Sequence, residues 1–274
     1  MSRIPATFAA LRAQGEVALV PFFTAGDPDL ATTRALVLAA VEAGADVVEL
    51  GVPFSDPMAD GPVLQRAAGR ALAGGTSLVR VLALVAELRR ATDVPIVLFG
   101  YYNPCLRYGV ERLARDAAAA GADAFLCVDL PPEEDGELRA AARANDLDVI
   151  RLLAPTTPPT RMRAIARAAS GFLYCVSVLG VTGGREALPR ELPALVARAR
   201  RVTDLPIGVG FGVQRPEQAA WIAGFADAVV VGSAIARLVE EGGGEGAVGR
   251  VAAFVRALRA AMSSAAGRRA APLG

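Results

Sequence analysis

The feature that most constrains the fold of this chain is a repeated alternation of short apolar segments with longer helix-like segments. Each apolar segment is rich in β-branched residues, is followed by a turn, and leads into a stretch rich in Ala, Leu and Arg. This order is typical of parallel βα units, and the continuous apolar character indicates strands that are covered on both faces. The predicted strands cover residues 18–23, 47–52, 95–101, 124–129, 148–153, 171–176, 206–210 and 228–231.

Eight βα units in 274 residues predict an α/β fold with a single (β/α)8 barrel, whose active site lies on the loops after the strands. Outside the repeats, residues 4–14 predict an extra helix within the N-terminal segment 1–15, which would close the bottom of the barrel. Residues 263–274 predict a flexible tail. No linker interrupts the pattern, so we expect one domain over residues 1–274.

Short sequence repeats support this architecture. Ala43-Gly44-Ala45-Asp46 and Ala120-Gly121-Ala122-Asp123 each precede a predicted strand. Glycine at the end of a helix supplies a left-handed cap, so both repeats predict the same tight turn into the next strand.

Charge and segment length exclude several classes of partner. The 29 basic and 28 acidic side chains nearly balance, which gives no electrostatic reason to expect nucleic acid or an anionic membrane. The apolar runs are of strand length and fall short of a membrane span. Because the N-terminal residues lack the apolar core of a secretory signal, we expect a cytoplasmic protein.

The sequence contains neither His nor Lys, and every basic side chain is Arg. This excludes Schiff-base chemistry on the chain, and it disfavours histidine-dependent triads and zinc sites, so we expect no metal. Arg cannot act as a base because its pKa is too high. Acid–base chemistry must therefore come from Asp, Glu, Tyr or Cys. The three cysteines are far apart in the sequence and predict reduced core thiols.

The segment from Glu49 to Pro62 carries the strongest functional signal. Glu49 lies inside an apolar strand, where burial would raise its pKa and suit it to proton transfer near neutral pH. Asp60 lies on the following loop. The structural alternatives are that Glu49 pairs with a buried Arg or hydroxyl and that Asp60 caps the helix that starts near Pro62.

Three glycine-rich turns follow the last three predicted strands, at residues 180–184, 210–212 and 232–235. Glycine lets backbone N–H groups approach an anion closely, and the third turn opens a short helix whose N-terminal dipole favours phosphate. The three turns would meet at one rim of the barrel, where such barrels bind phosphate. A phosphorylated substrate is predicted.

Five motifs together resemble the tryptophan synthase alpha subunit over nearly the whole chain: residues 21–28, 49–62, 101–104, 129–134 and 180–183. The resemblance implies cleavage of indole-3-glycerol phosphate to indole and glyceraldehyde 3-phosphate. It also implies an alpha2-beta2 complex in which indole passes to a beta subunit. Pyridoxal phosphate would belong to that beta subunit, and this chain would need no cofactor of its own.

The resemblance also implies residue roles. Glu49 would shuttle protons, and Asp60 would hydrogen-bond the indole N–H and stabilise positive charge on that nitrogen. The implied substrate-binding residues are Phe22, Tyr174, Thr182, Gly183, Phe211, Gly212, Gly232 and Ser233. The implied partner-interface residues are Pro53, Asp56, Pro57, Asn103 and Pro131.

Other interpretations stay open. The aromatic residues could be core, and the interface residues could be ordinary turn residues. Leu179 departs from the smaller or polar residue of many relatives, which bears on closure of its loop. The chain could also be another phosphate-binding barrel enzyme, such as a sugar-phosphate isomerase, or a catalytically weak activator of a beta subunit.

Overall fold

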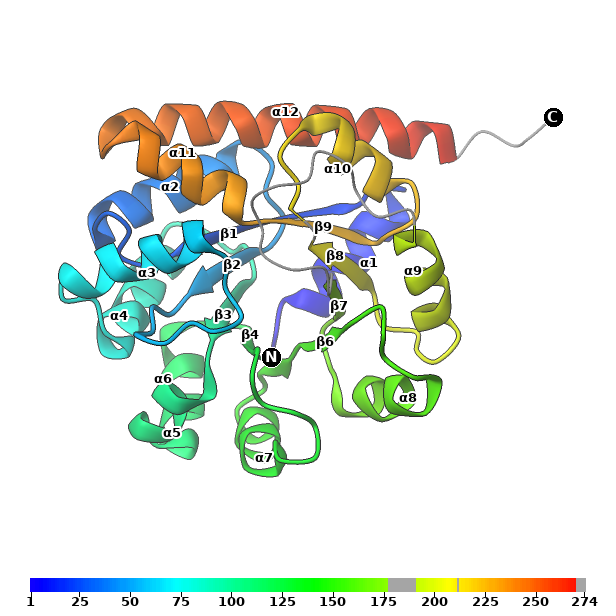
Figure 1. Cartoon of the computed structure of the whole chain (residues 1–274), viewed down its shortest axis with the longest axis horizontal. Helices are drawn as coiled ribbons and strands as arrows, with labels where there is room; N and C mark the ends of the chain where they lie inside the picture. Colours follow the sequence, from blue (N-terminus) through cyan, green and yellow to red (C-terminus); the bar gives the residue numbers. More distant parts are fainter. Residues whose placement is uncertain (177–190, 211, 270–274) are drawn as a thin grey trace.

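The computed structural model describes residues 1–176, 191–210 and 212–269, and these form a barrel of parallel strands inside a ring of helices (Figure 1). The strands are β1 (Ala18–Thr24), β2 (Val48–Gly51), β3 (Ile96–Gly100), β4 (Ala124–Cys127), β5 (Asp148–Val149), β6 (Arg151–Leu153), β7 (Leu173–Val176), β8 (Ile207–Gly210) and β9 (Ala228–Val231). Their order in the sheet is β5-β4-β3-β2-β1-β9-β8-β7-β6. The predicted (β/α)8 barrel is confirmed.

The predicted fifth strand is divided in the structure into β5 and β6. β5 pairs with β4, whereas β6 pairs with β7. The two pieces meet at Ile150, so one continuous segment pairs with both open ends of the sheet and nearly closes the ring. This is why nine strands occur among the described residues where eight were predicted.

The helices are α1 (Ile4–Ala13), α2 (Leu30–Glu42), α3 (Pro62–Ala73), α4 (Leu78–Arg89), α5 (Tyr102–Tyr108), α6 (Val110–Ala120), α7 (Gly136–Ala144), α8 (Pro159–Ala168), α9 (Leu192–Arg200), α10 (Pro216–Ala223), α11 (Ser233–Gly242) and α12 (Glu245–Arg269). Local sequence sets many of their ends. Asp29 caps α2 by accepting a hydrogen bond from the Thr32 N–H at 2.7 Å. Gly121 ends α6 at φ 94°, the left-handed conformation predicted for the repeated turn.

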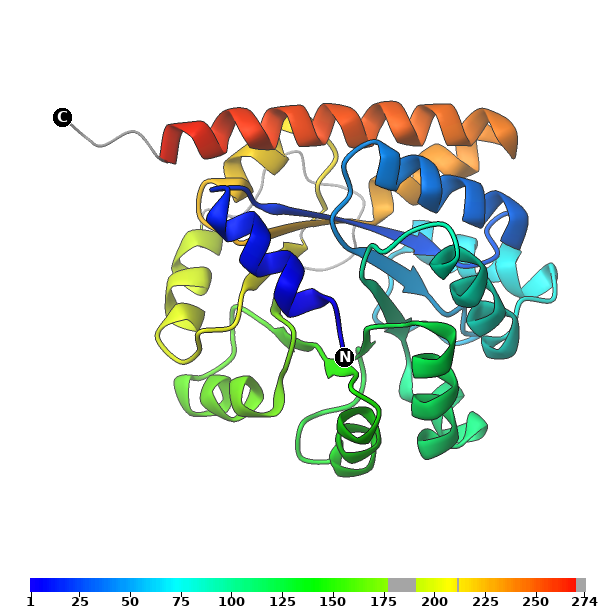
Figure 2. The same ribbon diagram turned by 180° about the vertical axis from the view of Figure 1, so that it is seen from behind.

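Helix α1 crosses the end of the barrel opposite the loops that follow the strands (Figure 2). Ile4 and Phe8 are buried in the barrel interior with Val20, Val97 and other inward-facing residues. Burial of these side chains holds the helix in place. The other helices pack against the outer face of the sheet, where a larger apolar cluster forms.

The last helix extends into the segment predicted to be a flexible tail. α12 continues to Arg269, so residues 263–269 are helical and do not belong to a tail; residues 270–274 lie outside the described residues. The helix packs on α10, α2 and α11 along one side of the barrel (Figure 1). No single helix in the described part of the chain is long and apolar enough to cross a membrane. Helices α3 and α4 reach the required length and hydropathy only when taken together, and they are sharply bent relative to each other.

Three aspartates at the bottom of the barrel hold neighbouring strands together. Asp46, Asp123 and Asp227 each stand just before a strand and accept the N–H of the first or second residue of an adjacent strand, at 2.7 or 2.8 Å. Each also forms an ion pair with at least one arginine. Two of them end the Ala-Gly-Ala-Asp repeats, so these repeats serve strand pairing as well as helix capping.

Candidate active site

Glu49 projects from β2 into the barrel interior. It alternates with Val48 and Leu50, which belong to the outer cluster, and shares the inward face with Val47. The side chain is 1% exposed, and neither carboxylate oxygen has a hydrogen-bond partner among the described residues. Burial alone raises the pKa of Glu49 from 4.5 to about 8. The alternative of a paired Glu49 is therefore wrong for the described part of the chain.

Asp60 lies on the loop between β2 and α3 and is held by one tyrosine. The Tyr101 hydroxyl donates to Oδ2 of Asp60 at 3.1 Å and accepts a hydrogen bond from the Ala59 N–H at 3.0 Å. Burial raises the pKa of Asp60 to about 6, and the bond from Tyr101 partly opposes that rise. The cap of α3 is Gly61, and no side chain caps it, so the capping alternative for Asp60 is wrong.

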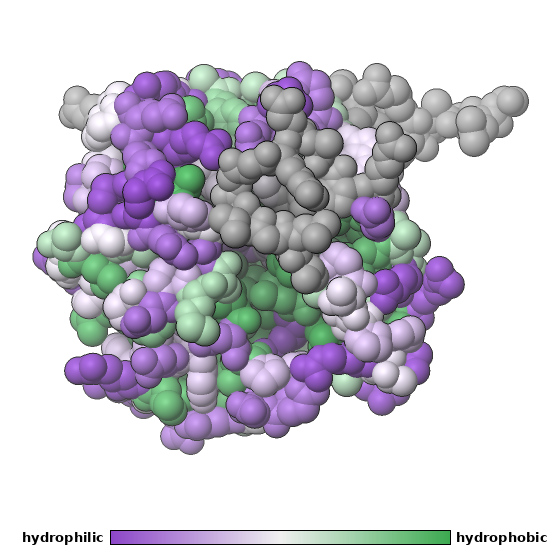
Figure 3. Space-filling model, in the orientation of Figure 1, coloured by the Kyte–Doolittle hydropathy of each residue, from purple (hydrophilic) through white to green (hydrophobic). Residues whose placement is uncertain are grey.

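A small pocket opens between these loops at the top of the barrel. It is lined by Asp60 and Tyr101 together with mostly apolar residues: Phe22, Thr24, Gly51, Val52, Pro53, Phe54, Leu64, Ala68, Phe99 and Gly100. Figure 3 shows a hollow with apolar walls in this face of the molecule. Glu49 lies two residues before Gly51 on the same inward face, about 7 Å deeper along the strand. The pocket thus has an apolar wall, one carboxylate at its rim and one below its floor.

Aromatic rings shape this pocket. The rings of Phe22 and Phe99 meet edge to face at a centroid distance of 5.0 Å. A Cβ added to Gly51 would lie 2.5 Å from the Phe22 ring, so glycine at this position makes room for that ring. On the far side of the barrel, the Tyr174 hydroxyl occupies the space that a Cβ on Gly210 would need. Burial and the nearby carboxylates raise the pKa of Tyr174, which keeps its hydroxyl protonated.

The third glycine turn has the predicted form. Helix α11 begins at Ser233 with Gly232 as its cap, and Ser233 is buried at the top of the barrel. Gly232 also packs against Phe22, which places the helix start beside the pocket. Gly212 has φ 50°, a conformation that glycine adopts without strain. Thr182, Gly183 and Phe211, as well as Leu179, lie outside the described residues.

Comparisons with known proteins point to one family. The family model described as tryptophan synthase alpha chain matches residues 8–263. The alpha chain of Citrifermentans bemidjiense is 54% identical over 259 residues, which cover 94% of this chain and 97% of that relative. The alpha chain of Geobacter sulfurreducens is 53% identical over 264 residues, covering 96% of this chain and all of that relative.

The chain belongs to the tryptophan synthase alpha chain family. Solved structures support the same conclusion. The alpha subunit of Legionella pneumophila superposes with a TM-score of 0.90 at 39% identity, covering 96% of this chain and 99% of that one. A chain of Mycobacterium tuberculosis tryptophan synthase gives a TM-score of 0.89 at 41% identity, covering 95% and 98%.

Membership of the tryptophan synthase alpha chain family fixes the reaction class. These chains are lyases that cleave indole-3-glycerol phosphate in tryptophan biosynthesis, and they work in a complex with a beta subunit. The family has no cofactor of its own, since pyridoxal phosphate belongs to the beta subunit. The sugar-phosphate isomerase alternative is therefore wrong. Within the described residues, no group of three or more acidic or cysteine side chains could hold a metal ion.

The residues predicted to face the beta subunit lie at the top of the barrel, four on loops and Asn103 in the first turn of α5. Asp56 and Asn103 are exposed, Pro57 and Pro131 are partly exposed, and Pro53 is buried in the pocket wall. Met58, on the same loop as Asp56, is 91% exposed. The exposed and partly exposed positions are compatible with a docking surface. Pro53 lies beneath that surface and would not contact a partner directly.

Sequence reasoning missed Tyr101 as a site residue. It was noted only as part of a motif at the end of the third predicted strand, although it makes the side-chain hydrogen bond to Asp60. A phenol directly after a barrel strand was the available signal, because strand ends carry the active-site residues of such barrels. Phe99 was missed as well, since an aromatic residue inside an apolar strand has no distinguishing sequence mark.

Proposed function

We propose that Glu49 and Asp60 divide the acid–base and electrostatic work of indole-3-glycerol phosphate cleavage in this chain. The observation that carries the proposal is their placement: Glu49 is buried with neither oxygen bonded to a described residue, whereas Asp60 lies at the pocket rim and is held by Tyr101. Burial raises the pKa of Glu49 to about 8 and that of Asp60 to about 6. At pH 7 the first carboxyl is mostly protonated and the second mostly ionised. Two carboxyl groups held in different protonation states by their environments are suited to different roles.

Glu49 supplies the proton transfers. Cleavage of the bond between the indole ring and the glycerol phosphate chain needs a proton on C3 of the ring, so that the ring can accept the bonding electrons. A base must then take the proton from the glycerol hydroxyl next to the breaking bond. A protonated Glu49 gives the first proton and, once ionised, accepts the second. Its lack of a described partner leaves both oxygens available for this cycle.

Asp60 stabilises the charge that protonation creates. When C3 of the indole ring gains a proton, positive charge develops on the ring nitrogen, and an ionised carboxylate that accepts the N–H bond lowers the energy of that state. The Tyr101 hydroxyl fixes one oxygen of Asp60 and leaves the other for the ring nitrogen. Phe22 and Tyr174 then bound the indole ring on either side.

The phosphate binds at the start of α11. The N–H groups of Gly232 and Ser233 and the positive end of the helix dipole favour an anion there, and no lysine is required. Gly212 on the neighbouring loop lets a second stretch of backbone approach the phosphate. By family resemblance Gly183 completes this cradle, Thr182 lies on the loop that closes over Asp60, and Phe211 contacts the substrate.

Indole release from indole-3-glycerol phosphate tests these roles. Glu49→Gln keeps the shape of the side chain but removes the exchangeable proton, so we expect kcat to fall by about 10² to 10⁴-fold. Glu111→Gln makes the same chemical change at an exposed position on α6 and should match the parent chain. An unchanged rate in Glu49→Gln would remove Glu49 from the mechanism. A parent chain that binds substrate without cleaving it would instead favour the activator alternative.

The top loops and the start of α5 form the proposed surface for the beta subunit, with Asp56, Pro57, Asn103 and Pro131 in contact and Pro53 behind them. We expect Asp56→Asn and Asn103→Ala to lower the ratio of indole release with and without the beta subunit. Glu111→Gln again serves as the control, because α6 lies on the outer ring. An unchanged ratio in both variants would place the interface elsewhere. The same proposal includes a cytoplasmic location, where the beta subunit and substrate would meet this chain.

A further inference from the structure

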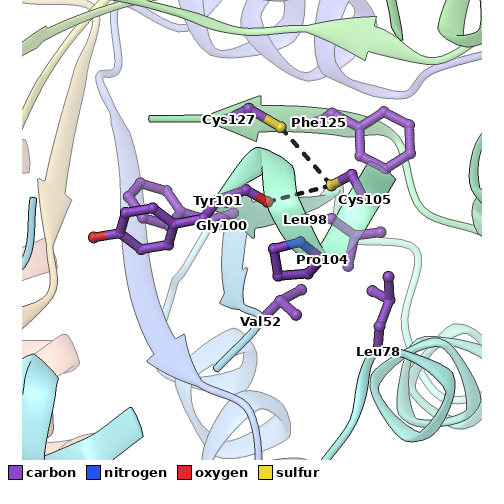
Figure 4. Close-up of a pocket in the computed structure, with 10 residues that line it drawn as sticks. Val52, Leu78, Leu98, Gly100, Tyr101, Pro104, Cys105, Phe125 and Cys127 are labelled. Carbon is purple, nitrogen blue, oxygen red and sulfur yellow. Dashed lines mark hydrogen bonds between the residues drawn. The ribbon is translucent and has the colours of Figure 1, made fainter. Parts of the chain in front are cut away.

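A second pocket lies on the outer side of the barrel wall, next to the active-site pocket. Figure 4 shows it between β3, the end of β4, and helices α4 and α5. The two pockets share Val52, Phe99, Gly100 and Tyr101 as lining residues, so these four separate the active site from the second pocket. The rest of the second lining is apolar except for two thiols, which the proposed reaction does not use.

The two thiols belong to Cys105 on α5 and Cys127 at the end of β4. Their sulfur atoms point toward each other across the pocket at 4.0 Å (Figure 4). Both cysteines are free, and they are 9% and 6% exposed. Cys175 is also free, but it is fully buried at 0% and lies on β7. Two of the three cysteines are thus paired in space, although 22 residues separate them in the sequence.

We propose that Cys105 and Cys127 form a dithiol modification site that hydrogen peroxide oxidises to a disulfide, and that this disulfide lowers the lyase activity through Tyr101. The sulfurs need to approach from van der Waals contact to a bond length of about 2 Å. Peroxide fits the site because it is small and uncharged, whereas bulky or charged oxidants would be excluded from an apolar pocket.

The chemistry balances in two steps. The thiolate of one cysteine attacks a peroxide oxygen, the O–O bond breaks, and a sulfenic acid and hydroxide form; the hydroxide takes up the proton released by the thiol. The second sulfur then attacks the sulfenic sulfur and displaces its hydroxyl group, which leaves as water with the second thiol proton. In total two thiols lose two hydrogens, and one peroxide becomes two waters. A dithiol reductant reverses the change.

The hydrogen bonds around the pair lead directly to the active site. The Cys105 thiol donates to the Tyr101 carbonyl at 3.5 Å, and the hydroxyl of the same tyrosine donates to Asp60 at 3.1 Å. Disulfide formation removes the first bond and draws the start of α5 toward β4. Because Tyr101 immediately precedes α5, we expect its ring to shift with the helix. Tyr101 is thus a positioning residue between the dithiol and Asp60.

The local environment also sets the rate of oxidation. The hydrogen-bonded neighbour Cys105 and burial raise the pKa of Cys127, which keeps that thiol protonated at neutral pH. Since the thiolate is the reactive form, attack of Cys127 on peroxide should be slow at pH 7 and faster at higher pH. A catalytic or rapidly sensing cysteine would show the opposite, a lowered pKa.

The test uses the full chain treated with hydrogen peroxide, followed by thiol titration after unfolding and by peptide mapping. We expect the titrated thiols to fall from three to one, with one intrachain peptide linking Cys105 to Cys127. Lyase activity should fall about tenfold to a hundredfold, because a displacement of about 1 Å at a positioning contact has effects of that size. Dithiothreitol should restore both.

Matched variants separate the parts of the inference. Cys175→Ala keeps the pair and should respond as the parent does, whereas Cys105→Ala and Cys127→Ala should keep their activity through the peroxide treatment. Oxidation of Cys105 and Cys127 only to sulfinic acid, or a thiol count that stays at three, would overturn the site. A disulfide that forms without loss of activity would overturn the link to Tyr101. The activity readout rests on the role proposed for Asp60, but the thiol count does not, so failure of either part can be distinguished.

Discussion

Asp123 and Glu49 are both fully buried carboxylates of the barrel, and their surroundings are opposite. Asp123, at the bottom, is 0% exposed and accepts hydrogen bonds from the backbone and side chain of Arg3, from Arg89 and from the Ile96 N–H, at 2.8 to 3.0 Å. Glu49, nearer the top, is 1% exposed and accepts none from the described residues. One end of the barrel neutralises its buried charge with partners, and the other leaves the charge to be neutralised by a proton.

The comparison teaches where stability and activity are separated in this fold. A buried carboxylate with several donors stabilises the folded state, because its removal would leave those donors unpaired. A buried carboxyl without partners destabilises the folded state whenever it is ionised. Such a group is expected only where its proton is needed for function.

The largest expected effect concerns the bottom of the barrel. Asp123→Ala should lower the free energy of unfolding by about 3 to 5 kcal/mol, because it leaves the partly buried Arg89 and the backbone N–H of Ile96 without their carboxylate partner. Urea unfolding followed by circular dichroism measures this. Indole release per folded molecule should stay within about twofold of the parent, and a large loss in the folded fraction would mean that the bottom of the barrel also controls the site.

The second prediction concerns the pH dependence of stability. The folded pKa of Glu49, about 8, lies above its ordinary value of 4.5. Its stabilising contribution is therefore fully present below pH 4.5 and is lost as the pH rises through 8. Glu49→Gln removes this dependence. Between pH 5 and 9, the free energy of unfolding of the variant should therefore rise relative to that of the parent by up to about 3 to 5 kcal/mol. Parallel unfolding curves for both chains across that range would contradict an unpaired Glu49.

A smaller effect is expected at Tyr101. Tyr101→Phe removes the hydrogen bond that lowers the pKa of Asp60, so that pKa should rise above about 6. The acid limb of the kcat/KM profile should move to higher pH, and indole release at pH 7 should fall by about tenfold. Tyr102→Phe removes the neighbouring hydroxyl, which does not line the pocket, and is the control. An unshifted acid limb would show that Tyr101 does not tune Asp60.

The smallest effect is expected from a single partner of Asp123. Arg3→Met removes one guanidinium from a group that also has Arg89 and two backbone N–H donors. Because the Arg3 side chain is partly exposed, we expect a loss of no more than about 1 kcal/mol in unfolding free energy. A loss as large as that of Asp123→Ala would show that the bottom network depends on this one pair.

Local sequence was enough to predict the barrel and the burial of Glu49 within it. The period of the apolar segments specifies parallel strands, and a Glu inside such a segment is conspicuous because burial of a charge is costly. The glycine-capped turns before the strands could be predicted too, since a glycine cap acts within a few residues. Predicted and observed strands therefore differ mainly by one or two residues at their ends.

Contacts between distant segments could not be predicted in the same way. Tyr101 and Asp60 meet across 41 residues, and Cys105 and Cys127 meet because α5 folds back beside β4. The division of the fifth strand at Ile150 follows from closing a ring of strands, which no single segment encodes. Asp60 was also a reasonable helix cap by sequence, but Gly61 takes that position and Tyr101 takes the carboxylate.

The pairing of β1 with both β2 and β9 has a consequence for how the chain is made. β1 is synthesised near the start, and its second neighbour appears only some 200 residues later; Arg259 of α12, which binds Asp46 and the carbonyls of Gly44 and Val17, appears later still. Until then one edge of β1 has no strand beside it. A nascent chain emerging from the ribosome thus carries an unsatisfied edge for most of its synthesis, the situation in which chaperones protect a folding protein from aggregation.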